Sequence, residues 1–398
     1  MSGSETLHLL RRCRSFHWIA TCALLTTLSC VDLNERRRPR ADSGANGGTD
    51  GTAGSAGTAG SAGAGGSSGK DASVEGGPDS GSGGTAGVPA WEGGIDADLG
   101  DAATPRILDV SGFPRVHDPA IIATEQAFYV FSTGDGIEVR RSTDLIHWET
   151  LPPVFAVNPA WIARQVPSAR ALWAPDISTF GGQYHLYYSA SSFGSRDSCI
   201  GHATTSSLES PAWVDHGAIV CTETTDDYNA IDPNSILDEL GQAWLSFGSF
   251  WSGIKMIALD ASGARSGNDM TAIASRQPDE EAIEAPYIVR QGGYFYLFVS
   301  FDLCCRATAS TYNIRVGRSA SVTGPYLDRD GTSLMEGGGT LVLTGGARWK
   351  GPGHNSVLLW EGHHLLVYHA YDANRGGEQT LRISEFVWDD EWPLSGGP

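Results

Sequence analysis

The chain has 398 residues, with 46 acidic against 27 basic side chains and a formal net charge of −19. So acidic a balance argues against nucleic acid and against an anionic membrane surface as partners. Most of the tryptophans lie after about residue 104, and this part is long enough to bury one large core.

Residues 1–30 have the pattern of an export signal. Arg11, Arg12 and Arg14 precede the apolar stretch Trp18–Leu28, which is too short to span a bilayer as a stable helix. The Leu-Ser-Cys ending is similar to a bacterial lipoprotein cleavage site, which predicts a lipid anchor on Cys30; an ordinary signal peptide is the alternative. We therefore expect an exported protein, either a cell-surface or outer-membrane lipoprotein or a secreted one.

Residues 31–103 form a low-complexity segment. From Ser43 to Gly87 it is almost entirely Gly, Ser, Ala and Thr. Such a composition buries too little apolar surface to offset the entropy of ordering the chain. We expect a flexible, disordered tether.

Residues 104–398 contain five copies of one pattern, a polar or glycine-marked turn followed by alternating aromatic and aliphatic residues. The copies are EQAFYVFS, GGQYHLYYS, GQAWLSFGS, GGYFYLFVS and GHHLLVYHA. Their turns start at residues 126, 182, 241, 293 and 362, so the steps are 56, 59, 52 and 69 residues. This spacing is typical of propeller blades and predicts an all-β, five-bladed β-propeller.

A short polar motif lies about eight residues before each turn. The motifs are HDPAII, WAPDIS, IDPNSI, EAPYIV and GHNSVL. If each motif opens a strand of its blade, one side chain from each meets the others at the mouth of the axial channel: Asp118, Asp176, Asp232, Glu284 and His354. We interpret residues 335–353 as an extended connection between blades that passes close to the site. Residues 107–119 are a candidate strand for closing the ring against the last blade.

Three of these acidic residues precede a proline: Asp118 and Asp232 directly, and Glu284 with one alanine between. Asp-Pro often marks a turn, which would explain any one of them. Three in equivalent repeats favour function, because paired carboxylates perform glycoside hydrolysis and a third raises the pKa of the acid by repulsion. Asp176 instead follows its proline, so we interpret it as structural or peripheral.

The folded region resembles glycoside hydrolase family 43, and within it the endo-acting α-1,5-L-arabinanases. The resemblance lies in HDPAII, LWAPDIS, YNAIDPNSI, FGSFWSGI, EAPYI, the CC and STY segment, and GPGHNSVL. It implies an inverting hydrolase of arabinan, with Asp118 as general base and Glu284 as general acid. Asp232 would orient the acid and tune its pKa. Inversion needs roughly 6.5–9.5 Å between the base and acid carboxyl groups.

The resemblance also implies further site residues. Trp173 and either Phe250 or Trp251 would stack on sugar rings, and Asn229 and Ser249 would make polar contacts, with Asn234 a further candidate. His354 would help to hold a calcium ion; a satisfied core histidine is the alternative. Where relatives have a glycine-containing loop before STY, this chain has Arg-Ala-Thr-Ala at 306–309, which puts the loop's shape in doubt.

The cysteines of the folded region form two pairs. Cys199 and Cys221 fall in one blade, and a disulfide between them is plausible in an exported protein. Cys304 and Cys305 are adjacent, and disulfides prefer a wider Cα spacing, so two buried thiols are favoured over a vicinal bridge.

Two other functions remain open at this point. One is a non-catalytic glycan-binding propeller, although such a module does not need a matched acid and base. The other is an exo-acting α-L-arabinofuranosidase or β-xylosidase on the same scaffold. We expect the protein to be a monomer.

Overall fold

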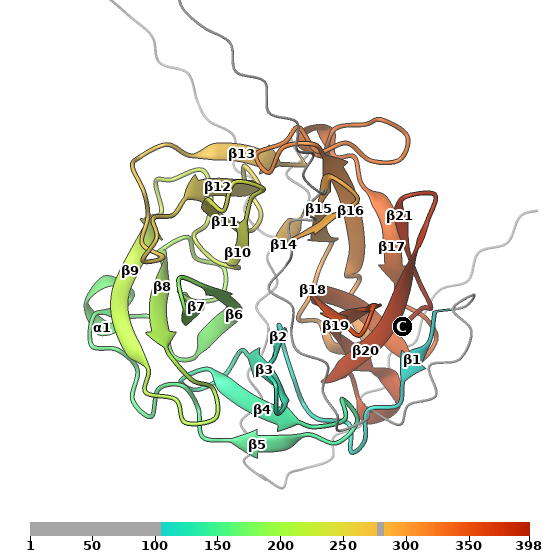
Figure 1. The fold of residues 1–398 in the computed structure, drawn as a ribbon, viewed down its shortest axis with the longest axis horizontal. Coiled ribbons are helices and arrows are strands. Elements are labelled where there is room, and N and C mark those ends of the chain that lie inside the picture. Colours follow the sequence, from blue (N-terminus) through green and yellow to red (C-terminus); the bar gives the residue numbers. More distant parts are fainter. Residues whose placement is uncertain (1–104, 277–281) are drawn as a thin grey trace, which may run out of the picture. The chain divides into compact units, whose positions relative to one another are not determined.

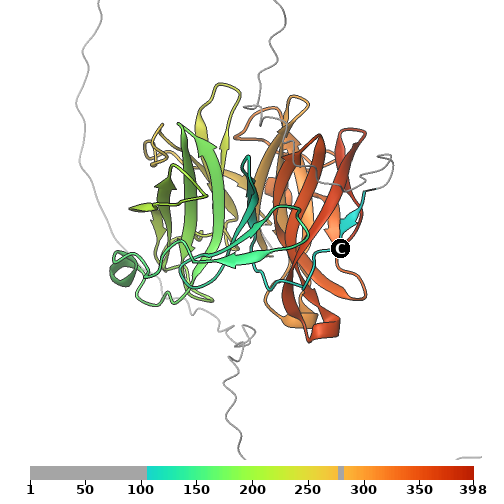
Figure 2. The same cartoon turned by 60° about the horizontal axis from the view of Figure 1, so that its bottom comes forward.

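The computed structural model describes residues 105–276 and 282–398. The predicted signal peptide (1–30) and tether (31–103) lie outside the described residues. The described part forms one sheet of five strands and four sheets of four. Figure 1 shows the five sheets around a central axis, and Figure 2 shows them from the side. The predicted all-β, five-bladed propeller is confirmed.

Each blade is an antiparallel meander whose first strand lies nearest the axis. The strands of blade one are β2 (Ala120–Ala123), β3 (Phe128–Ser132), β4 (Glu138–Ser142) and β5 (Glu149–Leu151). Blade two contains β6 (Leu172–Phe180), β7 (Gln183–Ala190), β8 (Ser198–Thr205) and β9 (Val214–Thr222). Blade three contains β10 (Asn234–Leu237), β11 (Ala243–Phe247), β12 (Ile254–Ala258) and β13 (Thr271–Ala274).

Blade four contains β14 (Ile283–Gln291), β15 (Tyr294–Phe301), β16 (Asn313–Ser319) and β17 (Thr340–Thr344). Blade five contains β18 (Trp349–Trp360), β19 (His363–Asp372), β20 (Glu378–Asp389) and β21 (Trp392–Ser395). The short helices are α1 (Ile162–Gln165), η1 (Ala307–Ala309), η2 (Leu334–Glu336) and η3 (Ala373–Arg375). No helix in the described ranges is long and apolar enough to cross a membrane.

The ring closes through the N-terminal side of the described chain. Strand β1 (Ile107–Leu108) pairs antiparallel with β20 of blade five, with Ile107 opposite Ser384. This confirms the closing strand predicted from residues 107–119. The prediction of a plain connection at 335–353 is wrong, because Thr340–Thr344 pairs with β16 as the outer strand of blade four and β18 starts at Trp349. Leu343 of this strand is buried in the core, which favours pairing of the segment with blade four.

The core lies between neighbouring blades, which explains why their middle strands are apolar on both faces. Tyr296 and Phe298 of β15 are buried with Tyr368 and Phe386 of blade five. Burial of one such side chain stabilises the fold by about 1.5–3 kcal/mol. Alternate residues of β15 pack in the opposite direction, toward blade three, so this strand needs apolar residues throughout.

Hydrogen bonds between inner strands fix the blades around the axis. The Asp176 carboxylate accepts from Asn234 Nδ2 (3.0 Å) and from the Ser235 amide (2.9 Å). Asn234 Oδ1 in turn accepts from the Ile288 amide of blade four (2.8 Å). Buried polar groups that are bonded in this way specify a single arrangement. Asp176 and Asn234 thus tie three inner strands together.

Cys199 and Cys221 form the predicted disulfide between β8 and β9, with a Cα–Cα distance of 4.1 Å. The bridge joins directly opposite residues of the antiparallel pair.

Acid pH is expected to destabilise the propeller through a buried histidine stack in blade two. His202 lies against His185, with a 3.0 Å contact between their ring nitrogens, and is 1% exposed. Burial, then repulsion from His185 and His216, lowers the pKa of His202 to about 3. The unfolded chain takes up this proton near pH 6.5 and the folded chain does not. Stability is therefore full above pH 6.5 and falls toward pH 3, by up to about 1.4 kcal/mol per pH unit.

Denaturant unfolding at pH 7.5, 6.0 and 5.0 measures this slope. In His202→Gln the slope should be shallower than in the parent, whatever the cost of the substitution at pH 7.5. An equal slope in both proteins would contradict the assignment.

Candidate active site

The five inner strands begin with one shared backbone feature. Each motif has one non-glycine residue with φ between 43° and 59°: Asp118, Ala174, Asp232, Ala285 and His354. A left-handed conformation is costly for these residues and is typical of functional sites. Asp118, Asp232 and His354 thus share one register, whereas Glu284 stands one position earlier and Asp176 two positions later.

Asp118 is buried and surrounded by hydrogen-bond donors. His117 Nδ1 lies 2.8 Å from its Oδ2, and Thr133 Oγ1 donates to the same oxygen at 2.6 Å. His354 Nδ1 is 3.1 Å from Oδ1. Burial alone would raise the pKa of Asp118, but the charges and hydrogen bonds of His117 and His354 hold it well below its ordinary value. This carboxylate is ionised at neutral pH.

The backbone beside Asp118 is fixed from two other blades. Its amide donates to His369 Nδ1 of blade five at 3.1 Å. The Ala174 amide of blade two donates to Thr133 Oγ1 at 2.8 Å, which holds that hydroxyl against the carboxylate. Burial lowers the pKa of His369 well below its ordinary value, so this imidazole is neutral and accepts through Nδ1.

Glu284 and Asp232 lie close enough to influence each other's charge. Burial, and then repulsion from Asp232, raises the pKa of Glu284 to about 8. Burial raises the pKa of Asp232 to about 6, partly against the attraction of His354. Asp232 Oδ2 accepts from the Ala285 amide at 3.1 Å, which connects the two motifs. At neutral pH Glu284 is therefore protonated and Asp232 largely ionised.

Two hydroxyl groups contact the Glu284 carboxyl group. Ser249 Oγ donates to Oε2 at 2.6 Å, and Tyr312 Oη contacts Oε1. Ser249, which we predicted to contact sugar, thus has a position beside the acid, and its sugar contact stays a prediction. Tyr312 ends the STY segment but was given no role by the sequence analysis, because the residue type alone does not show that its hydroxyl meets the acid.

His354 brings the positive charge of the site. Burial lowers its pKa, but the carboxylates of Asp118, Asp232 and Glu284 outweigh burial and raise it to about 9. Its amide donates to Ser300 Oγ at 2.8 Å, which ties β18 to β15. The structure therefore brings the three predicted carboxylates and His354 together.

The predicted sugar-binding aromatics lie on the same edge of their blades. Trp173 is partly buried at the start of β6, opposite Ser189 near the end of β7. Phe250 and Trp251 lie in the loop after β11, and the Arg196 guanidinium lies 5.0 Å from the centre of the Trp251 ring. One face of Trp251 is thus occupied.

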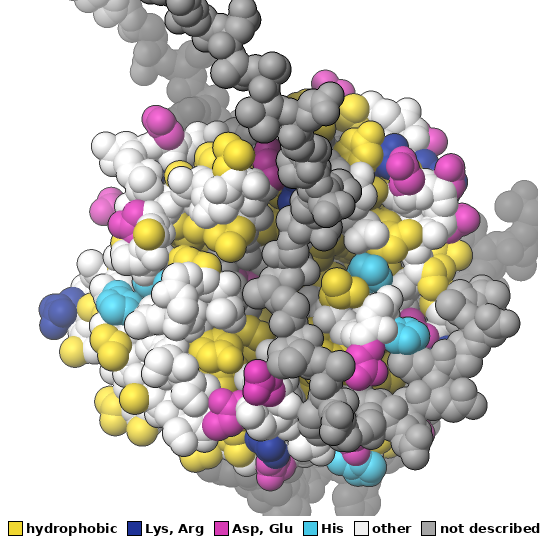
Figure 3. Space-filling model, viewed as in Figure 1, with side chains coloured by type: hydrophobic (Ala, Val, Ile, Leu, Met, Phe, Trp, Pro, Cys, Tyr) yellow, Lys and Arg dark blue, Asp and Glu magenta, His cyan; other side chains and the backbone are white. Residues whose placement is uncertain are grey.

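Phe193, which the sequence analysis did not name, is a further exposed aromatic residue on this edge. It is 65% exposed in the loop between β7 and β8, and the end of β7 pairs with the start of β6. Asn229 is buried and donates to the Ser195 carbonyl of this loop at 3.4 Å, so its observed contact supports the loop. The sequence signal for Phe193 was a single aromatic residue in a loop rich in Ser and Gly. Among the residues coloured in Figure 3, Lys and Arg side chains are scattered over the face in view and form no patch.

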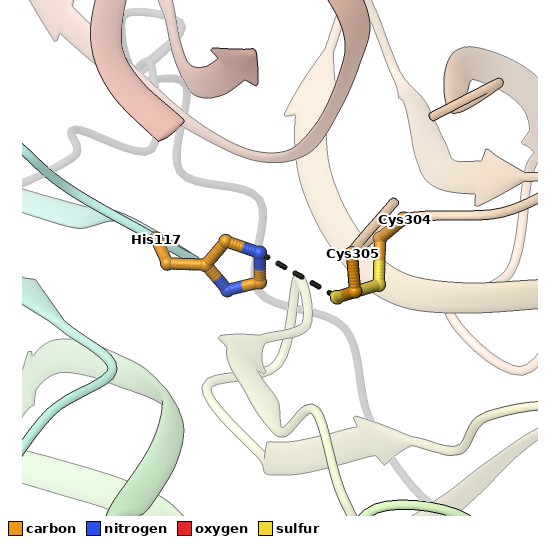
Figure 4. A group of neighbouring side chains, drawn as sticks. All are labelled: His117, Cys304 and Cys305. Carbon is orange, nitrogen blue, oxygen red and sulfur yellow. Dashed lines mark hydrogen bonds between the residues drawn. A yellow bond between two sulfur atoms is a disulfide. The ribbon is translucent and has the colours of Figure 1, made fainter. Parts of the chain in front are cut away.

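The prediction of two thiols at Cys304 and Cys305 is wrong. The two sulfurs form a vicinal disulfide with a Cα–Cα distance of 3.8 Å, beside His117 (Figure 4). The usual wider spacing does not exclude this bridge, because the local backbone adapts: Cys305 has φ 65°. Both cysteines are partly exposed.

A buried carboxyl group with a lowered pKa and one with a raised pKa, at the starts of inner strands of a five-bladed propeller, have the properties of the base and the acid of a glycoside hydrolase. The model of the glycosyl hydrolases family 43 matches residues 113–393. The chain belongs to this family.

Similar proteins carry more specific names. The extracellular endo-alpha-(1->5)-L-arabinanase 1 of Bacillus subtilis is 43% identical over 283 residues, covering 70% of this chain and 87% of that protein. The extracellular exo-alpha-(1->5)-L-arabinofuranosidase ArbA of Cellvibrio japonicus is 42% identical over 296 residues, covering 70% and 85%. The solved endo-arabinanase of Bacillus licheniformis has a TM-score of 0.69 and 45% identity, covering 72% of this chain and 99% of that one.

Proposed function

We propose that this protein hydrolyses internal α-1,5-linked L-arabinofuranosyl bonds of linear arabinan with inversion. The single observation that carries the proposal is the convergence of three buried carboxyl groups, Asp118, Asp232 and Glu284, from three blades, in surroundings that lower the pKa of Asp118 and raise that of Glu284. The similar Bacillus arabinanases support the substrate, as does a solved Cellvibrio arabinanase in complex with arabinohexaose, 42% identical with a TM-score of 0.69.

In this mechanism Asp118 is the general base and takes a proton from the attacking water. The water oxygen bonds to the anomeric carbon while the glycosidic C–O bond breaks. Glu284 gives its proton to the departing sugar oxygen. The charge of Asp232 raises the pKa of Glu284, so that Glu284 is protonated before the bond breaks. Trp173 and Phe193 are exposed enough to stack on sugar rings along the chain.

Product analysis tests the proposal and separates it from exo action, which the Cellvibrio exo-acting relative favours as second candidate. Purified protein is incubated with linear arabinan, and products are followed from the earliest times. Internal cleavage gives a ladder of oligomers at once; exo cleavage gives a single short product. No new reducing ends from folded protein would refute hydrolysis altogether.

Replacing Asp232 by Asn is expected to move the alkaline limb of the kcat/KM profile to lower pH. Burial and the Asp232 charge together hold the pKa of Glu284 at about 8, and activity falls as Glu284 ionises. Without that charge the pKa falls, so the acid form is lost earlier. A limb that stays in place would show that burial alone sets the pKa.

We also propose a calcium ion held by His354, with water as its other main ligands. A metal-binding histidine usually donates its second N–H to a carboxylate, and His354 Nδ1 lies 3.1 Å from Asp118 Oδ1. The surrounding carboxylates favour positive charge here, either as a proton on His354 or as a bound cation, so calcium would have to displace the proton from Nε2. Two other groups of the described residues could hold a metal, and both include His117: with Cys304 and Cys305, or with Asp118 and His369. The first is closed by the disulfide.

Calcium is expected to raise the melting temperature of protein stripped with a chelator. His354→Ala should abolish this shift, whereas His216→Ala, in blade two, should retain it. An equal calcium response in both variants would place the ion elsewhere.

Export follows as a further proposal, because two relatives are named extracellular. We propose lipid attachment at Cys30. Incorporation of labelled fatty acid that Cys30→Ala abolishes would support it, and release of unlabelled protein into the medium would refute it.

A further inference from the structure

The vicinal disulfide lies at one end of a hydrogen-bonded series that reaches Asp118. The Cys305 amide donates to Tyr371 Oη at 2.8 Å. Tyr371 Oη lies 3.0 Å from His117 Nε2, and His117 Nδ1 lies 2.8 Å from Asp118 Oδ2. Cys305 Sγ is also 3.7 Å from His117 Nε2, the contact drawn in Figure 4. Blades four, five and one each contribute to this series.

The direction of each hydrogen bond follows from the groups involved. Asp118 Oδ2 accepts from Thr133 Oγ1 and lies 2.8 Å from His117 Nδ1, so we take the N–H at Nδ1 as the donor of that contact. His117 Nε2 faces Tyr371 Oη at 3.0 Å and would then accept from the hydroxyl. A hydroxyl donates one hydrogen bond and accepts others, so Tyr371 Oη accepts from the Cys305 amide while its proton faces His117 Nε2 at 3.0 Å, with Cys305 Sγ farther away at 3.9 Å. His117 also stacks on His369, with 4.0 Å between ring centres, which limits its tilt.

The Cys305 amide is aimed at Tyr371 by an unfavourable backbone. Cys305 has φ 65°, which costs an L-residue roughly 1–2 kcal/mol. The next residues of the loop, 306–309, are exposed, and hydrogen bonds hold the loop on either side, from the Arg306 amide to Ser310 Oγ (3.0 Å) and from the Thr311 amide to the Leu303 carbonyl (2.8 Å). The covalent ring between Cys304 and Cys305 adds a restraint on the Cys305 peptide itself.

We propose that the Cys304–Cys305 disulfide is a positioning element for the general base: it holds the Cys305 amide against Tyr371, which sets the tautomer of His117 and so the orientation of the Asp118 carboxylate. This inference rests on the proposed role of Asp118. A disulfide that merely contacts sugar is the competing explanation, and the two differ in which kinetic parameter changes.

The first experiment compares kcat and KM on linear arabinan. Cys304→Ala/Cys305→Ala should lower kcat by roughly 10-fold or more with little change in KM, because a small misplacement of a reacting group is costly. Cys304→Ala/Cys305→Gly should recover much of kcat, since glycine adopts positive φ without a ring. The matched control Cys199→Ala/Cys221→Ala removes the other bridge and should leave kcat unchanged.

Sugar contact by the sulfurs predicts the opposite pattern, a raised KM in both 304/305 variants and no recovery with glycine; that result would overturn the proposal. Alkylation without reduction, followed by mass spectrometry, first checks the bridge. Labelling of Cys304 and Cys305 in the native parent protein would also overturn it.

The second experiment reads the tautomer without any activity. Side-chain ¹⁵N shifts of His117, assigned with a His117→Gln sample, should show protonated Nδ1 and bare Nε2 in the parent. Tyr371→Phe and Cys304→Ala/Cys305→Ala should both weaken that difference, and the glycine variant should restore it. Unchanged ¹⁵N shifts of His117 in folded variants would show that the hydrogen-bonded series does not set its tautomer, which would refute the proposal. Failure of the base role would instead appear as an active Asp118→Asn.

Discussion

Replacing Glu284 by Gln is expected to lower kcat on linear arabinan by about 10²–10⁴-fold, the range for loss of a general acid. Glutamine keeps the size of the side chain and its contacts with Ser249 and Tyr312, but it cannot release a proton. KM should change little, because the lost interaction forms only in the transition state.

Substrates that need no acid provide the decisive comparison. An aryl arabinofuranoside with a strongly acidic phenol departs without protonation, so Glu284→Gln should lose far less activity on it than on arabinan. Glu385→Gln is the matched control, since Glu385 is 8% exposed and paired with Arg106 and His363 on another part of blade five. Equal losses on both substrates would contradict the role of Glu284 as acid.

The sequence predicted the ring of blades because its two periodic signals are local. Turn glycines and the alternation within each strand depend only on neighbouring residues, and the 52–69-residue steps set the number of blades. The convergence of Asp118, Asp232 and Glu284 followed from equal distances to those turns. The one-residue offset of Glu284 is visible in the sequence EAP, but the sequence did not show that Ala285 takes the left-handed conformation that Asp118 and Asp232 take in their motifs.

The partners of the carboxylates could not be read from the repeats. Thr133, Tyr312 and His369 come from second strands or from loops, where each blade differs from the others. Thr133 and Tyr312 meet the carboxyl groups of their own blades once the strands pair, whereas His369 of blade five meets the Asp118 amide only after the ring closes. The disulfide at Cys304 was missed because the usual Cα spacing describes bridges between residues apart in the sequence, whereas these cysteines are adjacent, 3.8 Å apart, and Cys305 has φ 65°.

Replacing Asp118 by Asn is expected to reduce kcat by about 10⁴-fold, the upper end of the range for general acid–base catalysis, on arabinan and on aryl substrates alike. The attacking water must lose a proton whatever the leaving group, so a better leaving group cannot compensate. The substituted asparagine keeps the shape of the aspartate side chain, and His117 and Thr133 still surround it. This insensitivity to the leaving group separates the base from the acid, for which Glu284→Gln predicts selective recovery.

Asp176→Asn is the matched control within the same ring of motifs. Asp176 accepts from Asn234 and Ser235 and is 3% exposed, so its loss should lower the melting temperature while kcat falls far less than in Asp118→Asn. Initial rates and thermal unfolding of both variants, measured side by side, distinguish chemistry from packing. If Asp118→Asn kept near-parent turnover, or recovered on aryl substrates as Glu284→Gln should, Asp118 would not be the base, and the ionised carboxylate among His117, His354 and Thr133 would need another role.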